Sequence, residues 1–312
     1  MEKKGEIAER GTGLYIPPTF AELRFFDEEI LSPLAHLTTT DYQNGQWSLS
    51  GQQALQVTNA AAGVLGYQVV WYRHQQTQQD YLILSERQEQ STRRYWGTYV
   101  LRLGDVTPYI IQVPRPIFER NSFEQGVALF EQLKAWGILI AGAHPNANLD
   151  GRADLVQPEN KQNLFNLAHQ VFLREAGSDP QVVVQSRAFG PRPNRPMPEA
   201  DILFMTSEGQ ASQERMSPLA QRVIEALQKD GLQVQAINGS LDTAGFEAGS
   251  VAQALYLNQT RNKEFIVLWA SLQARARYQW RTESLVQEAQ FRTMGIPSVV
   301  SDLYTHLTSL GT

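Results

Sequence analysis

Residues 109–141 decide the fold, and they read YIIQVPRPIFERNSFEQGVALFEQLKAWGILIA. The segment starts with an apolar, strand-like run at 109–113 that a proline ends. Helical periodicity follows from Ser122, and one face of that helix carries Phe123, Val127, Phe130 and Leu133. Gly137 is the expected helix stop, and 138–141 is a second apolar strand. A strand, an amphipathic helix and another strand in this order are typical of an α/β sheet.

The same alternation extends on both sides of this segment. Further strands are expected at 81–84, 98–103, 182–185, 202–205, 232–237 and 265–269, and further helices at 163–174, 217–231, 250–260 and 282–294. Continuous apolar strands between amphipathic helices indicate a sheet that is covered on both faces. We therefore predict an α/β core over 81–312, with a mixed, mostly parallel sheet.

The first part of the chain is less regular. Residues 1–80 are expected to form an N-terminal arm and an α/β cap, with helices near 22–34 and 50–65 and a strand near 69–72. This extension precedes one main core, so the chain is predicted to hold a single large sheet rather than two equal domains.

Composition excludes several classes of protein. The chain has 312 residues, 42% hydrophobic residues, a net charge of -5 and no cysteine. The negative charge argues against nucleic-acid binding, and the lack of cysteine excludes disulfides and thiolate chemistry. No apolar run approaches the roughly 18 residues that span a bilayer. We expect a soluble, cytoplasmic protein, or a periplasmic one if the chain is a mature form or an excised fragment.

Polar side chains follow several of the predicted strands. Arg115 and Glu119 come after the strand at 109–113, His144 comes after 138–141, and Arg187 comes after 182–185. Open α/β sheets bind ligands beyond the carboxyl ends of their strands. These residues are therefore the place to look for a site.

Two of these segments carry a resemblance to known enzymes. Pro114-Arg-Pro-Ile-Phe-Glu119 and Ala141-Gly-Ala-His144, with the order of elements over 81–278, resemble the zinc-dependent amidohydrolase and carboxypeptidase-like α/β enzymes. N-formylglutamate amidohydrolases and poly-γ-glutamate hydrolases belong to that group. The resemblance implies hydrolysis of amide or peptide bonds. It also implies a zinc ion held by a His and an acid after one strand and by a His after a later strand, with a Glu as general base.

The sequence departs from this pattern at the residues that matter. Arg115 stands where the first His is expected, Arg187 where the second is expected, and Trp269 or Ala270 near the position of the Glu. A guanidinium group offers five donors and no acceptor lone pair, so it cannot replace imidazole on zinc. Glu119 alone remains of the implied set. We therefore expect no cofactor, with zinc possible only in a remodelled site.

The leading interpretation is a catalytically degenerate relative that binds an anion, either a carboxylate or a peptide-like group, or acts as a regulatory protein. Arg115, Arg187, His144 and Arg192 are the candidate ligand-binding residues, because guanidinium recognises carboxylate through paired hydrogen bonds. The alternative for these arginines is a structural one, in which they pair with neighbours such as Glu119 and Asp154.

Two other functions stay open. The first is an active amide or peptide hydrolase, with Glu119 and His144 as catalytic candidates and Glu119, His144, Asp150 and Asp154 as candidate metal ligands. The second is a structural subunit that docks a protein partner through the proline- and arginine-rich loop 190–198.

Overall fold

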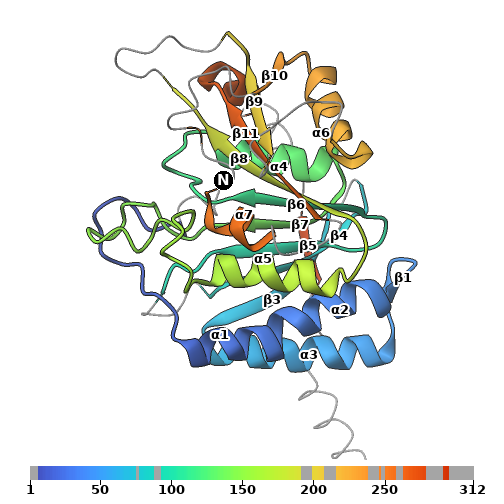
Figure 1. Ribbon diagram of the computed structural model, residues 1–312. Coiled ribbons are helices and arrows are strands. Elements are labelled where there is room, and N and C mark those ends of the chain that lie inside the picture. Colours follow the sequence, from blue (N-terminus) through green and yellow to red (C-terminus); the bar gives the residue numbers. More distant parts are fainter. Residues whose placement is uncertain are drawn as a thin grey trace, which may run out of the picture.

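Figure 1 shows the computed structural model, in which one large sheet crosses the molecule and helices cover both of its faces. The structure describes residues 6–74, 77–87, 93–190, 199–206, 216–237, 246, 250–257, 263–278 and 291–294. Among these residues, no helix combines the length and the apolar character needed to cross a bilayer.

The main sheet has ten strands in the described chain. They are β3 (Tyr67–His74), β4 (Asp80–Glu86), β5 (Thr98–Arg102), β6 (Thr107–Val113), β7 (Ala135–Ile140), β8 (Gln181–Ala188), β9 (Ile202–Thr206), β10 (Val234–Ala236), β11 (Lys263–Ala270) and β12 (Phe291–Met294). Their order across the sheet is β10-β9-β11-β8-β6-β7-β5-β4-β3-β12. A separate two-stranded hairpin pairs β1 (Tyr42–Gln43) with β2 (Gln46–Trp47).

The predicted α/β class and the mixed sheet are confirmed. The four neighbouring strands β11, β8, β6 and β7 run parallel. The strands from β12 to β7 on one side pair antiparallel, as does β9 with β11. Parallel pairs are thus not the majority that we expected. The connection between β3 and β4 is too short for a crossover, and such short connections join antiparallel strands.

The helices divide between the two faces of the sheet (Figure 1). One face is covered by α1 (Phe20–Phe26), η2 (Asp27–Leu31), α2 (Ser32–Thr40), α3 (Leu49–Val64), α5 (Leu164–Glu175) and α7 (Ala252–Leu257), and the other by α4 (Ser122–Gln132) and α6 (Pro218–Lys229). The apolar side chains form two buried clusters, one on each side of the sheet. Side chains alternate along the strands, so Ile110 faces α5 whereas Ile111 faces α4.

The N-terminal segment belongs to the same body as the rest of the chain. Strand β3 is a member of the main sheet, and α1 to α3 extend the covering layer beside α5. The arm before α1 pairs with the residues after β7 through a bridge between Ala8 and Ala143. The Ala8 amide donates to the Gly142 carbonyl at 2.9 Å, and the His144 amide donates to the Ala8 carbonyl at 2.8 Å. The arm therefore fixes the backbone that carries His144.

Two local predictions are wrong. Gly137 lies inside β7 instead of ending the preceding helix. The helix ends at Gln132, and Lys134 makes the turn with a positive φ of 50°. The helix expected over 282–294 is contradicted at 291–294, which form β12, while 282–290 lie outside the described residues.

Candidate functional site

The carboxyl ends of the four parallel strands lie side by side in the sheet. Three of the four strand ends, those of β6, β7 and β8, supply polar residues that were singled out in the sequence. The register aligns Gln112 of β6 with Gln185 of β8, and Trp269 of β11 with Arg187 of β8. Arg115 follows β6 directly, and His144 follows β7. The sheet thus brings together at one edge residues that are far apart in the sequence, as predicted.

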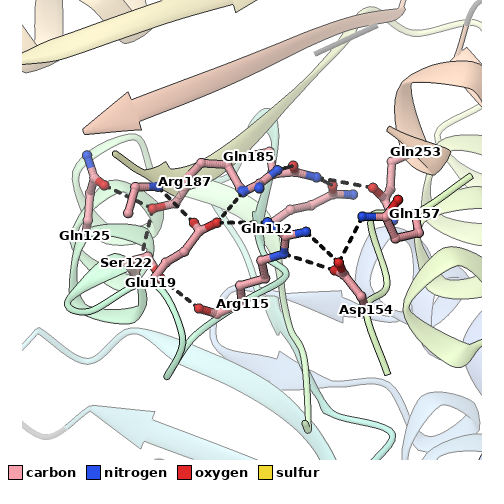
Figure 2. Close-up of polar contacts among 12 residues, drawn as sticks. Gln112, Arg115, Glu119, Ser122, Gln125, Asp154, Gln157, Gln185, Arg187 and Gln253 are labelled. Atoms are coloured by element: carbon pink, nitrogen blue, oxygen red, sulfur yellow. Dashed lines mark hydrogen bonds and ion pairs between the residues drawn. The ribbon is translucent and has the colours of Figure 1, made fainter. Parts of the chain in front are cut away.

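Arg115 and Arg187 are both engaged in ion pairs (Figure 2). Arg115 forms a two-point contact with Asp154, with Nε to Oδ1 at 3.0 Å and Nη2 to Oδ2 at 2.6 Å. Arg187 Nε donates to Glu119 Oε1 at 2.8 Å. Arg115 Nη1 lies 3.5 Å from the same Glu119 oxygen, so one carboxylate joins the two arginines. The structural alternative for these arginines is therefore the arrangement observed.

Glu119 is the centre of this cluster. Its Oε2 accepts the backbone amide of Ala188 at 2.8 Å, while Oε1 accepts Arg187. The turn after β6 places it, because the Glu119 amide donates to the Arg115 carbonyl at 3.0 Å and Asn121 takes a left-handed φ of 64° before α4. Arg187 has 0% exposed surface, so Glu119 supplies the charge that allows the guanidinium to be buried.

A chain of buried amides continues from Arg187 along the face of the sheet that α5 covers (Figure 2). Arg187 Nη1 donates to Gln185 Oε1 at 3.2 Å, and Gln185 Nε2 donates to Gln112 Oε1 at 3.2 Å. Gln112 Nε2 lies 2.9 Å from His169 Nδ1, and His169 Nε2 lies 3.0 Å from the Gln253 carbonyl. A carbonyl oxygen only accepts, so His169 carries its proton on Nε2 and accepts from Gln112 on Nδ1.

His144 lies beside the cluster without bonding to its charges. Its ring packs edge-on against Phe118 at 5.2 Å, and the Arg115 guanidinium lies 5.8 Å from the same Phe118 ring. His144 Nδ1 accepts the Asn146 amide at 2.9 Å. Burial lowers the pKa of His144, and the nearby positive charges of Arg10 and Arg115 add to this effect. The imidazole is therefore neutral at pH 7.

Two residues at and after the end of β11, Trp269 and Arg275, were not among the candidate site residues. Trp269 lies under the Arg187 guanidinium, whose central carbon is 4.4 Å from the ring centroid. Arg275 follows on the helical residues 272–278, and its Nε donates to the Ser271 carbonyl at 3.3 Å. Each of the two side chains is 4% exposed. Arg275 Nη1 and Trp269 Nε1 are buried and have no hydrogen-bond partner among the described residues.

Charge and burial distinguish Arg275 from the other two arginines. Burial lowers the pKa of Arg275, and only the charge of Glu119 opposes this effect. The cluster therefore contains three guanidinium groups (Arg115, Arg187, Arg275) and two carboxylates (Glu119, Asp154). Its formal charge is +1. Arg275 lies shortly after the end of β11, where a ligand-binding residue is expected in an α/β sheet. No pattern in the sequence indicates that its side chain is buried.

The donor set does not fit the zinc ion that the family resemblance implies. Glu119 and Asp154 are occupied by arginine, and Asp154 Oδ2 also accepts Gln157 Nε2 at 3.1 Å. Asp150 lies in an exposed turn, where it pairs with Arg152. Over the ranges that the structure describes, no three His, Cys, Asp or Glu side chains are grouped as a metal site requires. Arg192 and residues 191–198 lie outside the described residues.

Comparison with protein-family models and with curated proteins found no match. Among solved structures, LapB from Legionella pneumophila matches at 13% sequence identity over 85% of this chain and 69% of that chain, with a TM-score of 0.27. A TM-score this low does not indicate a common fold.

Proposed function

We propose that this chain is a non-catalytic binding or regulatory protein whose ligand is an anion with a carboxylate group, such as a peptide terminus or a glutamate-like side chain. The ligand would bind at the carboxyl ends of β6, β8 and β11. The observation that carries the proposal is the pair of buried donors on Arg275 and Trp269, which have no partner in the part of the chain that the structure describes.

These two donors cannot satisfy each other or be satisfied by the arginines around them. Guanidinium and indole groups donate only, so the missing partner must be an acceptor. A buried donor without a partner costs about 1–3 kcal/mol, and more when it is charged. An acceptor that reached both groups would relieve this cost on each of them, which favours a ligand over an empty site.

The charge of the cluster selects the kind of acceptor. Two of the three arginines are neutralised by Glu119 and Asp154, and Arg275 has no carboxylate within ion-pair distance among the described residues. A neutral acceptor such as water would leave this positive charge uncompensated in a buried place. A carboxylate would satisfy the donors and neutralise the charge together.

The arrangement also argues against hydrolysis by the same residues. A general base needs a carboxylate or imidazole that is free to take a proton. Glu119 accepts two hydrogen bonds at 2.8 Å, Asp154 is held by Arg115, and the unprotonated Nδ1 of His144 already accepts the Asn146 amide. Stoichiometric zinc in the purified protein that is lost in His144→Ala would overturn the proposal in favour of the hydrolase.

The test is a calorimetric titration of the whole chain with N-acetyl-L-glutamate and, in parallel, with N-acetyl-L-glutamine amide, which has no carboxylate. The proposal expects the acid to bind and the amide not to bind. Arg275→Gln should weaken binding of the acid by about tenfold or more, because a charge-assisted hydrogen bond contributes about 1.5–3 kcal/mol. Trp269→Phe, which removes the indole N–H and keeps a smaller aromatic ring beside Arg187, should weaken it by about fivefold.

Arg174→Gln is the control for the loss of one positive charge, because Arg174 lies on α5, where it pairs with Asp27 away from the candidate anion site. The proposal would be refuted if folded Arg275→Gln bound N-acetyl-L-glutamate as tightly as the wild type does.

A further inference from the structure

Helix α3 presents an uncharged face to solvent at the lower edge of the helical layer in Figure 1. Its 16 residues include no Asp, Glu, Lys, Arg or His. The face that packs on the rest of the fold carries Gly51, Leu55, Thr58 and Ala62. Helices on the surface of soluble proteins normally direct charged side chains to solvent. The outer face of α3 is therefore unusual for a helix that only covers a sheet.

The outer face forms one stripe along the helix. Its exposed residues are Ser50, Gln53, Val57, Ala60 and Val64, at alternating intervals of three and four residues. Val57 has 68% of its surface exposed and Val64 has 72%. Alternating intervals of three and four are the spacing of a seam between two packed helices. The stripe therefore has the pattern of a helix-packing surface, and no helix of the described chain covers it.

Charged groups of opposite sign lie at the two ends of the stripe. At the N-terminal end, the Asp41 carboxylate accepts the hydroxyl groups of Ser48 and Ser50 at 2.6 and 3.2 Å. At the C-terminal end, the Arg87 guanidinium lies over Gly63, with Nη2 2.9 Å from the position that a Cβ of Gly63 would take. The surface thus carries a negative end, an uncharged middle and a positive end.

A surface with this distribution of charge is complementary to itself. In a two-fold pair of antiparallel helices, the negative end of one chain lies at the same end of the pair as the positive end of the other. Asp41 of one copy is then near Arg87 of its partner at both ends, whereas a parallel pair would bring like charges together. The net charge of -5 makes copies repel each other in general, so an uncharged face is where they approach most easily.

We propose that two copies of this chain associate through α3, with the helices antiparallel about a two-fold axis near Val57. Val57 and Ala60 lie at the centre of the interface, and Gln53 of one copy lies near Val64 of the other. Association removes the exposed valines of both copies from water, which supplies the driving force. The proposal does not rest on the anion-binding function, because α3 contributes no residue to the candidate anion site.

The first test is sedimentation equilibrium of the intact chain over a series of concentrations. The wild type should show a mass that rises with concentration toward that of two chains. Val57→Glu should weaken association by about a hundredfold or more, because like charges would then meet at the two-fold axis. Leu149→Glu is the matched control, since Leu149 is a fully exposed residue in a turn outside α3, and it should associate as the wild type does.

The second test determines the direction of the pair by cross-linking, which is specific because the chain has no cysteine of its own. Gln53→Cys and Val64→Cys are made in separate chains and treated with a short bismaleimide. An antiparallel pair should be linked when the two variants are mixed, and much less in either variant alone.

Three results would overturn the proposal. Linkage of each cysteine variant to its own copy would show a parallel pair. Unchanged association of folded Val57→Glu would place the interface elsewhere on the molecule. A wild type that stays monomeric at every concentration would leave the stripe to a partner of another kind. None of these results depends on whether the candidate anion site binds its ligand.

Discussion

Arg187 and His169 lie at the two ends of one hydrogen-bonded chain that passes through Gln185 and Gln112. Because a guanidinium group only donates, Arg187 fixes the amide oxygen of Gln185 toward itself, and each following amide must point the same way. At the other end the Gln253 carbonyl fixes the proton of His169 on Nε2. The hydrogen bonds therefore all run in one direction, and this direction requires the His169 tautomer that carries its proton on Nε2.

The first prediction concerns the stability of the protein in mild acid. Burial lowers the pKa of His169 to about 4 from an ordinary value of 6.5. The unfolded chain therefore takes up a proton below about pH 6.5, whereas the native protein does so only near pH 4. Stability should be full above pH 6.5 and fall by about 3 kcal/mol as the pH drops toward 4. Urea denaturation over this range measures the loss.

His169→Gln isolates this contribution, because a Gln side chain can also accept one hydrogen bond and donate another but does not titrate. The difference in stability between the wild type and this variant should shrink as the pH falls from 7 to 5. A difference that stays constant over this range would contradict the assignment.

The second prediction concerns Glu119. Glu119→Gln removes the charge that compensates the buried Arg187, and breaking a buried pair on one side costs about 3–5 kcal/mol. Denaturant titration should show a loss of about 3 kcal/mol, since Gln retains one acceptor. Asp150→Asn is the control, because Asp150 also pairs with an arginine but lies in an exposed turn. This variant should be as stable as the wild type. Equal effects of the two substitutions would refute a central role for Glu119.

The third prediction separates ligand affinity from stability. Asp154→Asn should lower stability by about 1–3 kcal/mol, because Arg115 loses its two-point partner. The same change raises the formal charge of the cluster from +1 to +2. If the proposed anion site is right, affinity for N-acetyl-L-glutamate should rise by roughly threefold to tenfold, in line with about 1 kcal/mol of added attraction. A lower affinity for N-acetyl-L-glutamate in a folded Asp154→Asn variant would contradict the proposed anion site.

The fourth prediction concerns the close approach of two backbone segments next to the site. A Cβ added to Gly142 would lie 2.4 Å from the Tyr95 carbonyl oxygen, and one added to Gly97 would lie 2.4 Å from the Ile140 carbonyl oxygen. Gly97 also has a φ of +112°. Gly142→Ala should destabilise the protein by about 3 kcal/mol or more, since backbone must move. Gly190→Ala, with nothing within 4 Å of its added Cβ, should keep the melting temperature of the wild type.

The sequence was most informative where a strand is apolar on both faces. The runs at 138–141, 182–185 and 265–269 are continuous because helices cover both sides of β7, β8 and β11. The ends of the runs at 138–141 and 182–185 then located His144 and Arg187 at one edge of the sheet. The proportion of antiparallel pairs could not be read in this way, because periodicity does not reveal which strands become neighbours.

Partners of the site residues were harder to predict than the residues themselves. Asp154 is 39 positions from Arg115, and the Gln253 carbonyl is 84 positions from His169. These two contacts depend on how the loop that carries Asp154 and helix α7 pack against the sheet. Local sequence patterns do not predict such packing. A local pattern can also mislead. Gly137 was expected to end the helix, but it lies inside β7, and Lys134 makes the turn before that strand.

Strand β8 carries Gln181 at its first position and Arg187 near its last, about 20 Å apart at roughly 3.3 Å per residue. The strand is hydrogen-bonded to β11 on one side and β6 on the other, so it cannot slide without breaking both ladders. Changes at such a distance, with no shared contacts, usually add independently. Substitutions at Gln181 and at Arg187 should therefore change the stability of the protein independently of each other.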